Sequence, residues 1–301
     1  MKHLKNILLT VLALAVFESG CKKEEDPLDH EQYIKQAYLV GSNKSNNDGL
    51  TIVKIPYSKT ADEEQLVNVS VAVGGSQKID RNISVELSEA GDEAITRYNT
   101  LYRYKDTDVK YQKLATTFYT IPNKTVSVKS GESYGVTPVH FKTNGLNADL
   151  PYAITLKISS ISDPDYVSIR KVDTVLMLSF SLTNAYSDGY QMQGKSYKLV
   201  NALPTDTTTI SIPRTLTALD FNTVRLYHLS NTEILPNAAA FGVKIKVMDD
   251  NTLSITPWGT LAITAGGGSY SPTARVFNFW YNYTVSGVVY QFKGKLTRNS
   301  A

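Results

Sequence analysis

Cysteine is almost absent from this chain, which has a single residue of that type, Cys21, among 301. One cysteine excludes an intramolecular disulfide framework and a cysteine-rich metal site. Histidine is also scarce, with four residues, and no His-Glu-x-x-His segment occurs, so the usual ligands of a zinc hydrolase are missing. The net charge of +3 is too small to indicate nucleic acid as the main partner.

The N-terminus has the pattern of an export signal. Two lysines precede an apolar run over Ile7–Phe17, which is too short to span a bilayer as a helix. Small residues then lead to Cys21, although Glu18 stands where the usual motif prefers leucine. The segment resembles a bacterial lipoprotein signal, in which the cysteine becomes lipid-linked. We therefore expect a signal peptide over residues 1–20 and a lipidated, flexible tether over residues 21–32.

The residues after the cysteine resemble a second targeting signal. Lys22–Pro27 reads Lys-Lys-Glu-Glu-Asp-Pro, which resembles the lipoprotein export signal of the Bacteroidetes. The resemblance implies a lipid-anchored protein of the outer membrane that faces the extracellular side. A charged, solvated tether is the simpler alternative, and the two are compatible.

The rest of the chain has the composition and periodicity of β-structure. Tyrosine is abundant, with 19 residues, and Val67, Val69, Val71 and Val73 alternate with polar residues. Many short runs of this kind, separated by turn residues, predict an all-β protein of two domains. The first is a β-sandwich over residues 33–185, and the second is an antiparallel β-barrel or β-sandwich over residues 186–301.

The two domains are expected to differ in the segments that connect their strands. In the first domain, Ser88 is a plausible N-cap, and the apolar residues that follow it recur at helical spacing, which predicts one short helix. In the second domain we expect no helix, hairpin turns that include Ser286-Gly287, and a flexible loop at Gly266–Gly268.

Several stretches resemble a known pair of domains. Ala94–Asn99, Tyr119–Gly131 and Leu150–Leu156 are similar to domain of unknown function 1735 of Bacteroidetes lipoproteins. Phe277–Tyr283 and Tyr290–Arg298 are similar to its usual C-terminal partner, domain of unknown function 4361. The resemblance implies that the sandwich is immunoglobulin-like and that the protein is a surface lipoprotein of a polysaccharide-utilisation system, and it offers no catalytic residues to carry over.

The acidic and histidine residues do not form a recognisable catalytic pattern. The pairs Asp106/Asp108, Asp163/Asp165 and Asp249/Asp250 lie in expected turns or loops, where solvated acids are common. His140 and His228 lie on separate domains, and each is expected to be a strand residue whose ring nitrogens have hydrogen-bond partners. We therefore predict a protein that is not an enzyme and that has neither a metal site nor a cofactor.

Aromatic residues are the best candidates for a binding site. In Val276–Val285 successive side chains point to opposite faces, and four aromatic residues share the face expected to be buried. Those residues are Phe277, Phe279, Tyr281 and Tyr283. Trp280 is left on the other face between Asn278 and Asn282, where a ring and two amides offer stacking and hydrogen bonds to a sugar. Packing of Trp280 under a loop or against the first domain is the alternative.

Two further aromatic residues are weaker candidates for the same role. Trp258 lies at a strand end or turn, as either a ligand platform or a loop anchor. Tyr270 follows the glycine-rich segment and would close over a ligand if that segment were a mobile loop.

The expected function is binding of polysaccharide or glycoprotein glycans at the cell surface, with an outer-membrane transporter or a glycosidase as partner. The alternative is an adhesive or scaffolding lipoprotein that binds host or partner protein, since a fold does not fix a function.

Overall fold

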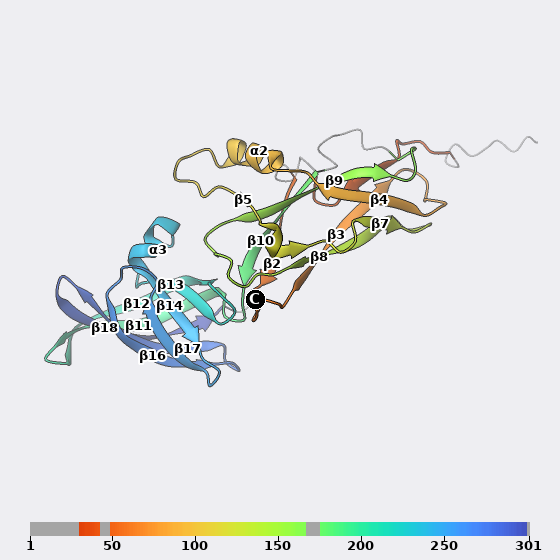
Figure 1. The fold of residues 1–301 in the computed structure, drawn as a ribbon. Coiled ribbons are helices and arrows are strands. Elements are labelled where there is room, and N and C mark those ends of the chain that lie inside the picture. The colour runs from red at the N-terminus through yellow and green to blue at the C-terminus, as the bar shows by residue number, and fades with distance from the viewer. Residues whose placement is uncertain (1–29, 43–48, 167–174, 300–301) are drawn as a thin grey trace, which may run out of the picture.

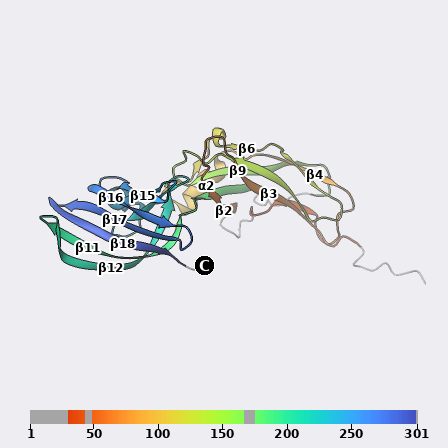
Figure 2. The same cartoon turned by 90° about the horizontal axis from the view of Figure 1, so that it is seen from below.

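The computed structural model describes residues 30–42, 49–166 and 175–299, which form two β-domains joined end to end (Figures 1 and 2). Cys21 and the expected signal peptide lie outside these residues. No helix in the described part of the chain is both long and apolar enough to cross a bilayer.

The N-terminal domain is a two-layer β-sandwich. One sheet has the order β1-β3-β8-β6, and the other has the order β2-β10-β9-β4-β7, with β5 added beside β9. Alternate residues of both sheets meet in one apolar core that includes Val69, Val71 and Phe141, as the period-two pattern predicts. The strands are β1 (Gln36–Leu39), β2 (Leu50–Pro56), β3 (Gln65–Gly74), β4 (Ile83–Glu89), β5 (Gln112–Lys113), β6 (Tyr119–Thr120), β7 (Thr125–Val128), β8 (Tyr134–Phe141), β9 (Tyr152–Ile161) and β10 (Val175–Thr183).

The helix of this domain begins later than the sequence predicts. Ser88 lies in β4, and α2 covers Glu93–Tyr102 with Asp92 at its N-cap position. A short 3-10 turn, η3 (Thr116–Phe118), follows before β6. The buried Ile95 of α2 packs on the outer face of the larger sheet, beside Met177 of β10. The helix therefore covers a second, small core outside the sandwich.

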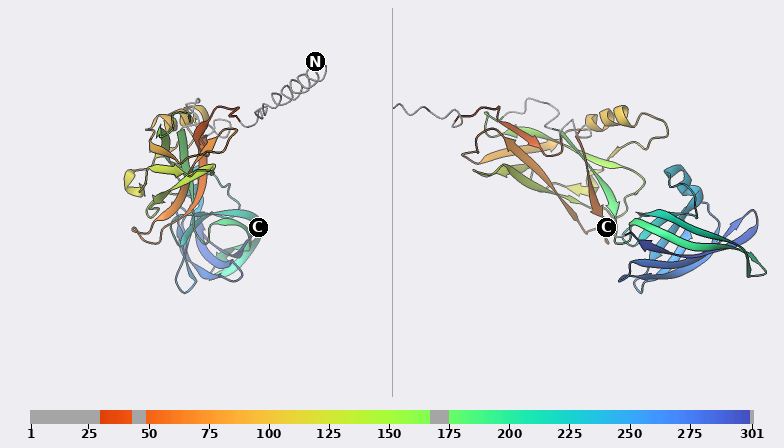
Figure 3. Two further views of the ribbon diagram at one scale, coloured as in Figure 1. Left: turned by 90° about the vertical axis from the view of Figure 1, so that its right-hand side faces the viewer. Right: turned by 180° about the vertical axis from the view of Figure 1, so that it is seen from behind.

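The C-terminal domain is a closed barrel of eight strands, which decides between the two predicted architectures. The strands close in a ring in the left view of Figure 3. Every neighbouring pair is antiparallel, and β18 closes the ring by pairing with β11. The strands are β11 (Asp188–Val200), β12 (Leu203–Ala218), β13 (Thr223–Tyr227), β14 (Gly242–Val247), β15 (Thr252–Pro257), β16 (Ile263–Ser271), β17 (Val276–Val285) and β18 (Val288–Arg298).

Two expectations for this domain are wrong and one is confirmed. Gly266–Gly268 is not a flexible loop but part of β16, hydrogen-bonded between β15 and β17. A short helix, α3 (Leu235–Phe241), also interrupts the strands. Ser286-Gly287 forms the predicted hairpin turn, with both residues at positive φ.

Specific polar contacts join the two domains. Arg225 of β13 makes a two-pronged ion pair with Asp149 of the sandwich, at 2.5 and 2.8 Å. Asn184, which follows β10, donates to the carbonyl oxygens of Asp220 and Thr223 in the barrel. These contacts hold the barrel against the end of the sandwich.

Candidate functional site

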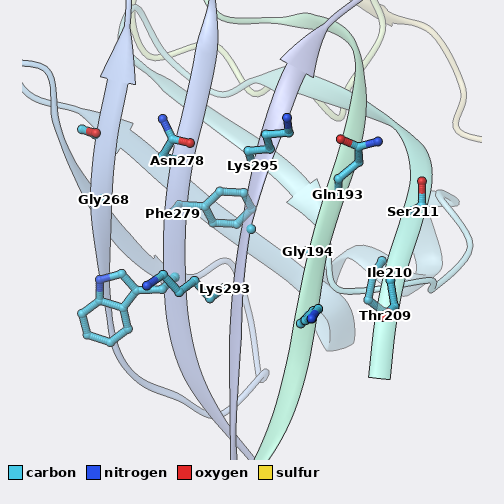
Figure 4. Close-up of a pocket in the computed structure, with 14 residues that line it drawn as sticks. Gln193, Gly194, Thr209, Ile210, Ser211, Gly268, Asn278, Phe279, Lys293 and Lys295 are labelled. Carbon is cyan, nitrogen blue, oxygen red and sulfur yellow. The ribbon is translucent and has the colours of Figure 1, made fainter. Parts of the chain in front are cut away.

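A shallow groove of about 720 Å³ runs across the outer face of the barrel over strands β16, β17, β18, β11 and β12 (Figure 4). Strand register places its outward-facing side chains in two rows. The first row is Ser269, Asn278, Lys295, Gln193 and Ser211. The second row is Trp280, Lys293, Lys195 and Thr209. These nine residues are the groove residues, and five strands contribute to them.

The floor between the two rows is mainly backbone. The register positions between the two rows are occupied, in order across the strands, by Gly268, Phe279, Gly294 and Gly194. A Cβ built on Gly194 or Gly294 would lie 2.7 Å from the ring of the buried Phe292. The glycines therefore let the barrel wall lie directly on its aromatic core.

Trp280 lies on the outer face, as the alternation in β17 predicts. Phe277, Phe279, Tyr281 and Tyr283 are all buried, whereas 36 % of Trp280 is exposed. Its indole nitrogen approaches Gly267 of β16, where a Cβ would lie 4.0 Å away. A glycine neighbour leaves one side of the indole uncovered, so the ring offers an apolar surface at the edge of the groove.

The two asparagines beside Trp280 differ in position. Asn278 is exposed and lines the groove, where its amide can both donate and accept. Asn282 is half-buried and outside the groove lining, and its Oδ1 accepts a hydrogen bond from Gln291 Nε2 at 2.9 Å. The structure thus brings Trp280 together with Asn278, while Asn282 supports the neighbouring pair of strands.

Trp258 lies away from the groove, just after β15. Its ring lies 5.4 Å from the guanidinium carbon of Arg225, the residue that pairs with Asp149. Its backbone N–H donates to the carbonyl oxygen of Gly242. These contacts fit the loop-anchor alternative, because the indole covers a buried cation at the domain junction.

The expectation that Tyr270 closes over a ligand does not agree with the structure. Tyr270 is 9 % exposed and packs on Phe277, with 4.6 Å between ring centres, and edge-on against Tyr186. It belongs to the core because β16 continues through the glycine segment, so Tyr270 shares the inward face with its cross-strand partner Phe277.

A buried polar cluster occupies the barrel interior. Nδ1 of His228 lies 2.8 Å from the hydroxyl of Tyr281, and Tyr283 bonds Ser196 at 2.8 Å. Burial, with a smaller contribution from the cation of Arg214, lowers the pKa of His228 to about 4. The imidazole is therefore neutral at physiological pH and serves packing. His140, on the sandwich, instead pairs with Glu64 at 2.6 Å.

The acidic pairs in turns have structural roles. The buried Asp163 accepts from Arg81 at 2.9 Å, Asp250 accepts from the backbone and hydroxyl of Thr252, and Asp108 accepts from the backbone N–H of Lys105. Within residues 30–42, 49–166 and 175–299, no group of three or more His, Cys, Asp or Glu residues is placed to hold a metal ion.

Sequence reasoning missed most of the groove. Lys195, Lys293, Lys295, Gln193 and Ser211 come from β11, β12 and β18, and nothing in the linear pattern reveals that β18 lies between β17 and β11. The one available signal was the alternation Lys293-Gly294-Lys295, which places both lysines on one face of a strand.

The comparisons with known proteins agree with this two-domain organisation. A family model for an N-terminal domain matches residues 31–165, and one for a C-terminal domain matches residues 174–297. No curated protein matches the chain.

Solved structures from Bacteroides share the fold. A multidomain protein with DUF1735 from Bacteroides ovatus is 17 % identical, with a TM-score of 0.59 over 88 % of this chain and 94 % of that one. A B. ovatus protein of unknown function is 12 % identical, with a TM-score of 0.63 over 88 % and 94 %. An auxiliary nutrient binding protein from Bacteroides thetaiotaomicron is 17 % identical, with a TM-score of 0.58 over 85 % and 92 %.

Identities this low establish the fold alone. The two family matches, which lie in the order N-terminal domain then C-terminal domain, agree with the DUF1735 resemblance of the first domain. Together they show a chain of two domains, in the order N-terminal domain then C-terminal domain, with the fold of a DUF1735-containing protein from Bacteroides ovatus.

Proposed function

We propose that this protein is a non-catalytic, lipid-anchored protein of the cell surface that binds polysaccharide through the groove on its C-terminal barrel. The observation that carries the proposal is the placement of the exposed Trp280 beside Asn278 on an open, backbone-floored groove. A sugar ring has an apolar face and a rim of hydroxyls, and an exposed indole with a neighbouring amide matches both.

The shape of the groove supports a polymer rather than a small metabolite. It is shallow, and it crosses five strands, which is about 19 Å at the usual spacing of about 4.8 Å between neighbouring strands. A ligand-enclosing cavity would instead bury most of a small molecule. A chain of sugars lying across the strands suits an open groove.

The remaining parts of the proposal concern location and partners. The lipobox-like segment before Cys21 and the charged residues after it support an anchor in the outer membrane that faces outward. A protein of the same fold is described as an auxiliary nutrient binding protein, which is in keeping with capture of glycans for a transporter or glycosidase partner.

The test is affinity electrophoresis of the purified protein against a panel of plant, fungal and host polysaccharides. We expect at least one polysaccharide to retard the protein, and Trp280→Ala to weaken that binding by about tenfold or more. Tyr134→Ala is the matched control, because Tyr134 is an exposed aromatic on a strand of the other domain. Folded protein that binds no polysaccharide, or binds equally well without the indole, would contradict the proposal.

A further inference from the structure

Three lysines gather on the groove face of the barrel. Lys293 lies directly opposite Lys195 in the pairing of β18 with β11, and Lys295 follows Lys293 on the same face of β18. All three side chains are exposed. The three lysines come from two neighbouring strands, β11 and β18, so this part of the barrel wall carries concentrated positive charge.

These lysines have no carboxylate partner in direct contact among the described residues. None of the three lysines forms an ion pair with a residue of 30–42, 49–166 or 175–299, and the groove lining includes no Asp or Glu. Like charges directly opposite each other on neighbouring strands are unfavourable. An anion bound between the ammonium groups would offset their mutual repulsion. A groove with this charge therefore attracts anionic ligands.

The neutral groove residues limit what kind of anion fits. Gln193 lies between Lys295 and Ser211 in the strand register, and Trp280 lies directly opposite Lys293. Amides, hydroxyls and an indole bind hydroxyl groups and the apolar faces of sugar rings. A groove that follows one line across the strands also fits an extended chain better than a planar lipid surface.

We infer that the ligand of this groove is an anionic polysaccharide, whose carboxylate or sulfate groups pair with Lys195, Lys293 and Lys295 while a sugar ring stacks on Trp280. The inference rests on the proposed function and specifies its substrate class. Trp280 supplies the stacking surface, and the lysines select charged over neutral polymers.

The experiment compares matched polymers. Dextran and dextran sulfate differ only in sulfation, and polygalacturonate adds a carboxylate polymer. We expect the sulfated or carboxylated polymers to bind at least tenfold more tightly than dextran, with binding that weakens as salt rises, because salt screens exposed charges. The triple variant Lys195→Gln, Lys293→Gln, Lys295→Gln should lose at least tenfold in affinity for the anionic polymers.

The matched control removes the same charge from the sandwich. Lys78, Lys124 and Lys129 are exposed there, and their triple change to Gln should leave binding unchanged. Circular dichroism and thermal unfolding check that both triple variants are folded. An equal loss in the two triple variants would indicate an effect of net charge alone and would overturn the inference.

The remaining outcomes separate the inference from the proposed function. If neutral polysaccharides bind through Trp280 at least as tightly as the anionic polymers do, and the groove-lysine variant binds the anionic polymers as wild type does, the inference is wrong and the proposed function stands. If no polysaccharide binds, both fail. If vesicles of phosphatidylglycerol or duplex DNA bind through the same lysines as tightly as the anionic polysaccharides, the inference is overturned in favour of a general anion surface.

Discussion

At the scale of single residues, burial decides what a side chain can do. His228 and Trp280 both belong to the barrel, but the imidazole is enclosed by Tyr281 and Tyr283 while the indole faces outward. An enclosed imidazole is disfavoured in its charged form, since burial removes the water that would stabilise the cation. His228 should therefore contribute to stability in a manner that depends on pH.

The pKa of His228 is lowered to about 4 in the folded protein, against about 6.5 for an unfolded chain. The unfolded state therefore binds the proton first as pH falls, and the stability from this residue is complete above about pH 6.5 and lost towards pH 4. The loss is about 3 kcal/mol at pH 4, because each unit of pKa difference corresponds to about 1.4 kcal/mol.

Urea unfolding at pH 7 and pH 4 would measure this effect. His228→Gln keeps a polar group near the Tyr281 hydroxyl but cannot take up a proton in this range. We expect its free energy of unfolding to fall less between the two pH values than that of wild type. Equal decreases in the two proteins would show that His228 is not the group responsible.

At the scale of elements, strand register builds the groove. The paired glycines of β11 and β18 place backbone against the Phe292 ring, so the wall has no room for side chains on its inner side there. A Cβ at Gly294 would lie 2.5 Å from the carbonyl oxygen of Gln193 and 2.9 Å from the Cα of Gly194. Both atoms are backbone, so the strands themselves would have to move.

Gly294→Ala should accordingly destabilise the protein by about 1–3 kcal/mol, the usual cost of overpacking a core. It should also weaken polysaccharide binding, because the floor of the groove would shift. Gly74→Ala, on β3, is the matched control, since a Cβ there would meet no atom within 4 Å. Chemical denaturation of the two variants compares them directly, and similar losses would contradict the packing argument.

At the scale of the whole molecule, a buried ion pair connects the two domains. Arg225 and Asp149 are 4 % and 15 % exposed at their side chains, and Trp258 covers the guanidinium. Removal of one partner leaves a buried charge without compensation, which typically costs about 3–5 kcal/mol. Replacement of both partners by neutral groups costs much less.

We therefore expect Asp149→Ala to lower the free energy of unfolding by about 3 kcal/mol or more, and the double variant Asp149→Ala with Arg225→Met to recover part of that loss. A double-mutant cycle by urea unfolding measures the coupling. Small-angle scattering should show a wider range of domain arrangements in Asp149→Ala. Strictly additive losses and unchanged scattering would remove the role assigned to the pair.

Local periodicity and local turn chemistry were enough to predict several features of the barrel. The alternation in β17 placed Phe277 inward and Trp280 outward, and Ser286-Gly287 indicated its hairpin, because a strand exposes alternate residues whatever its neighbours are. The same local reasoning failed at Gly266–Gly268, where glycine suggested a loop but two neighbouring strands hold the backbone extended.

The pairing of distant strands depends instead on the folding of the whole domain. Closure of the barrel pairs β18 with β11, and this pairing brings Lys195 against Lys293 and completes the groove beside Trp280. The tertiary structure also places Tyr270 in the core beside Phe277 and Arg225 against Asp149 of the other domain. Such contacts join residues far apart in the chain, and they form because the whole barrel buries its apolar faces at once, which no short segment encodes.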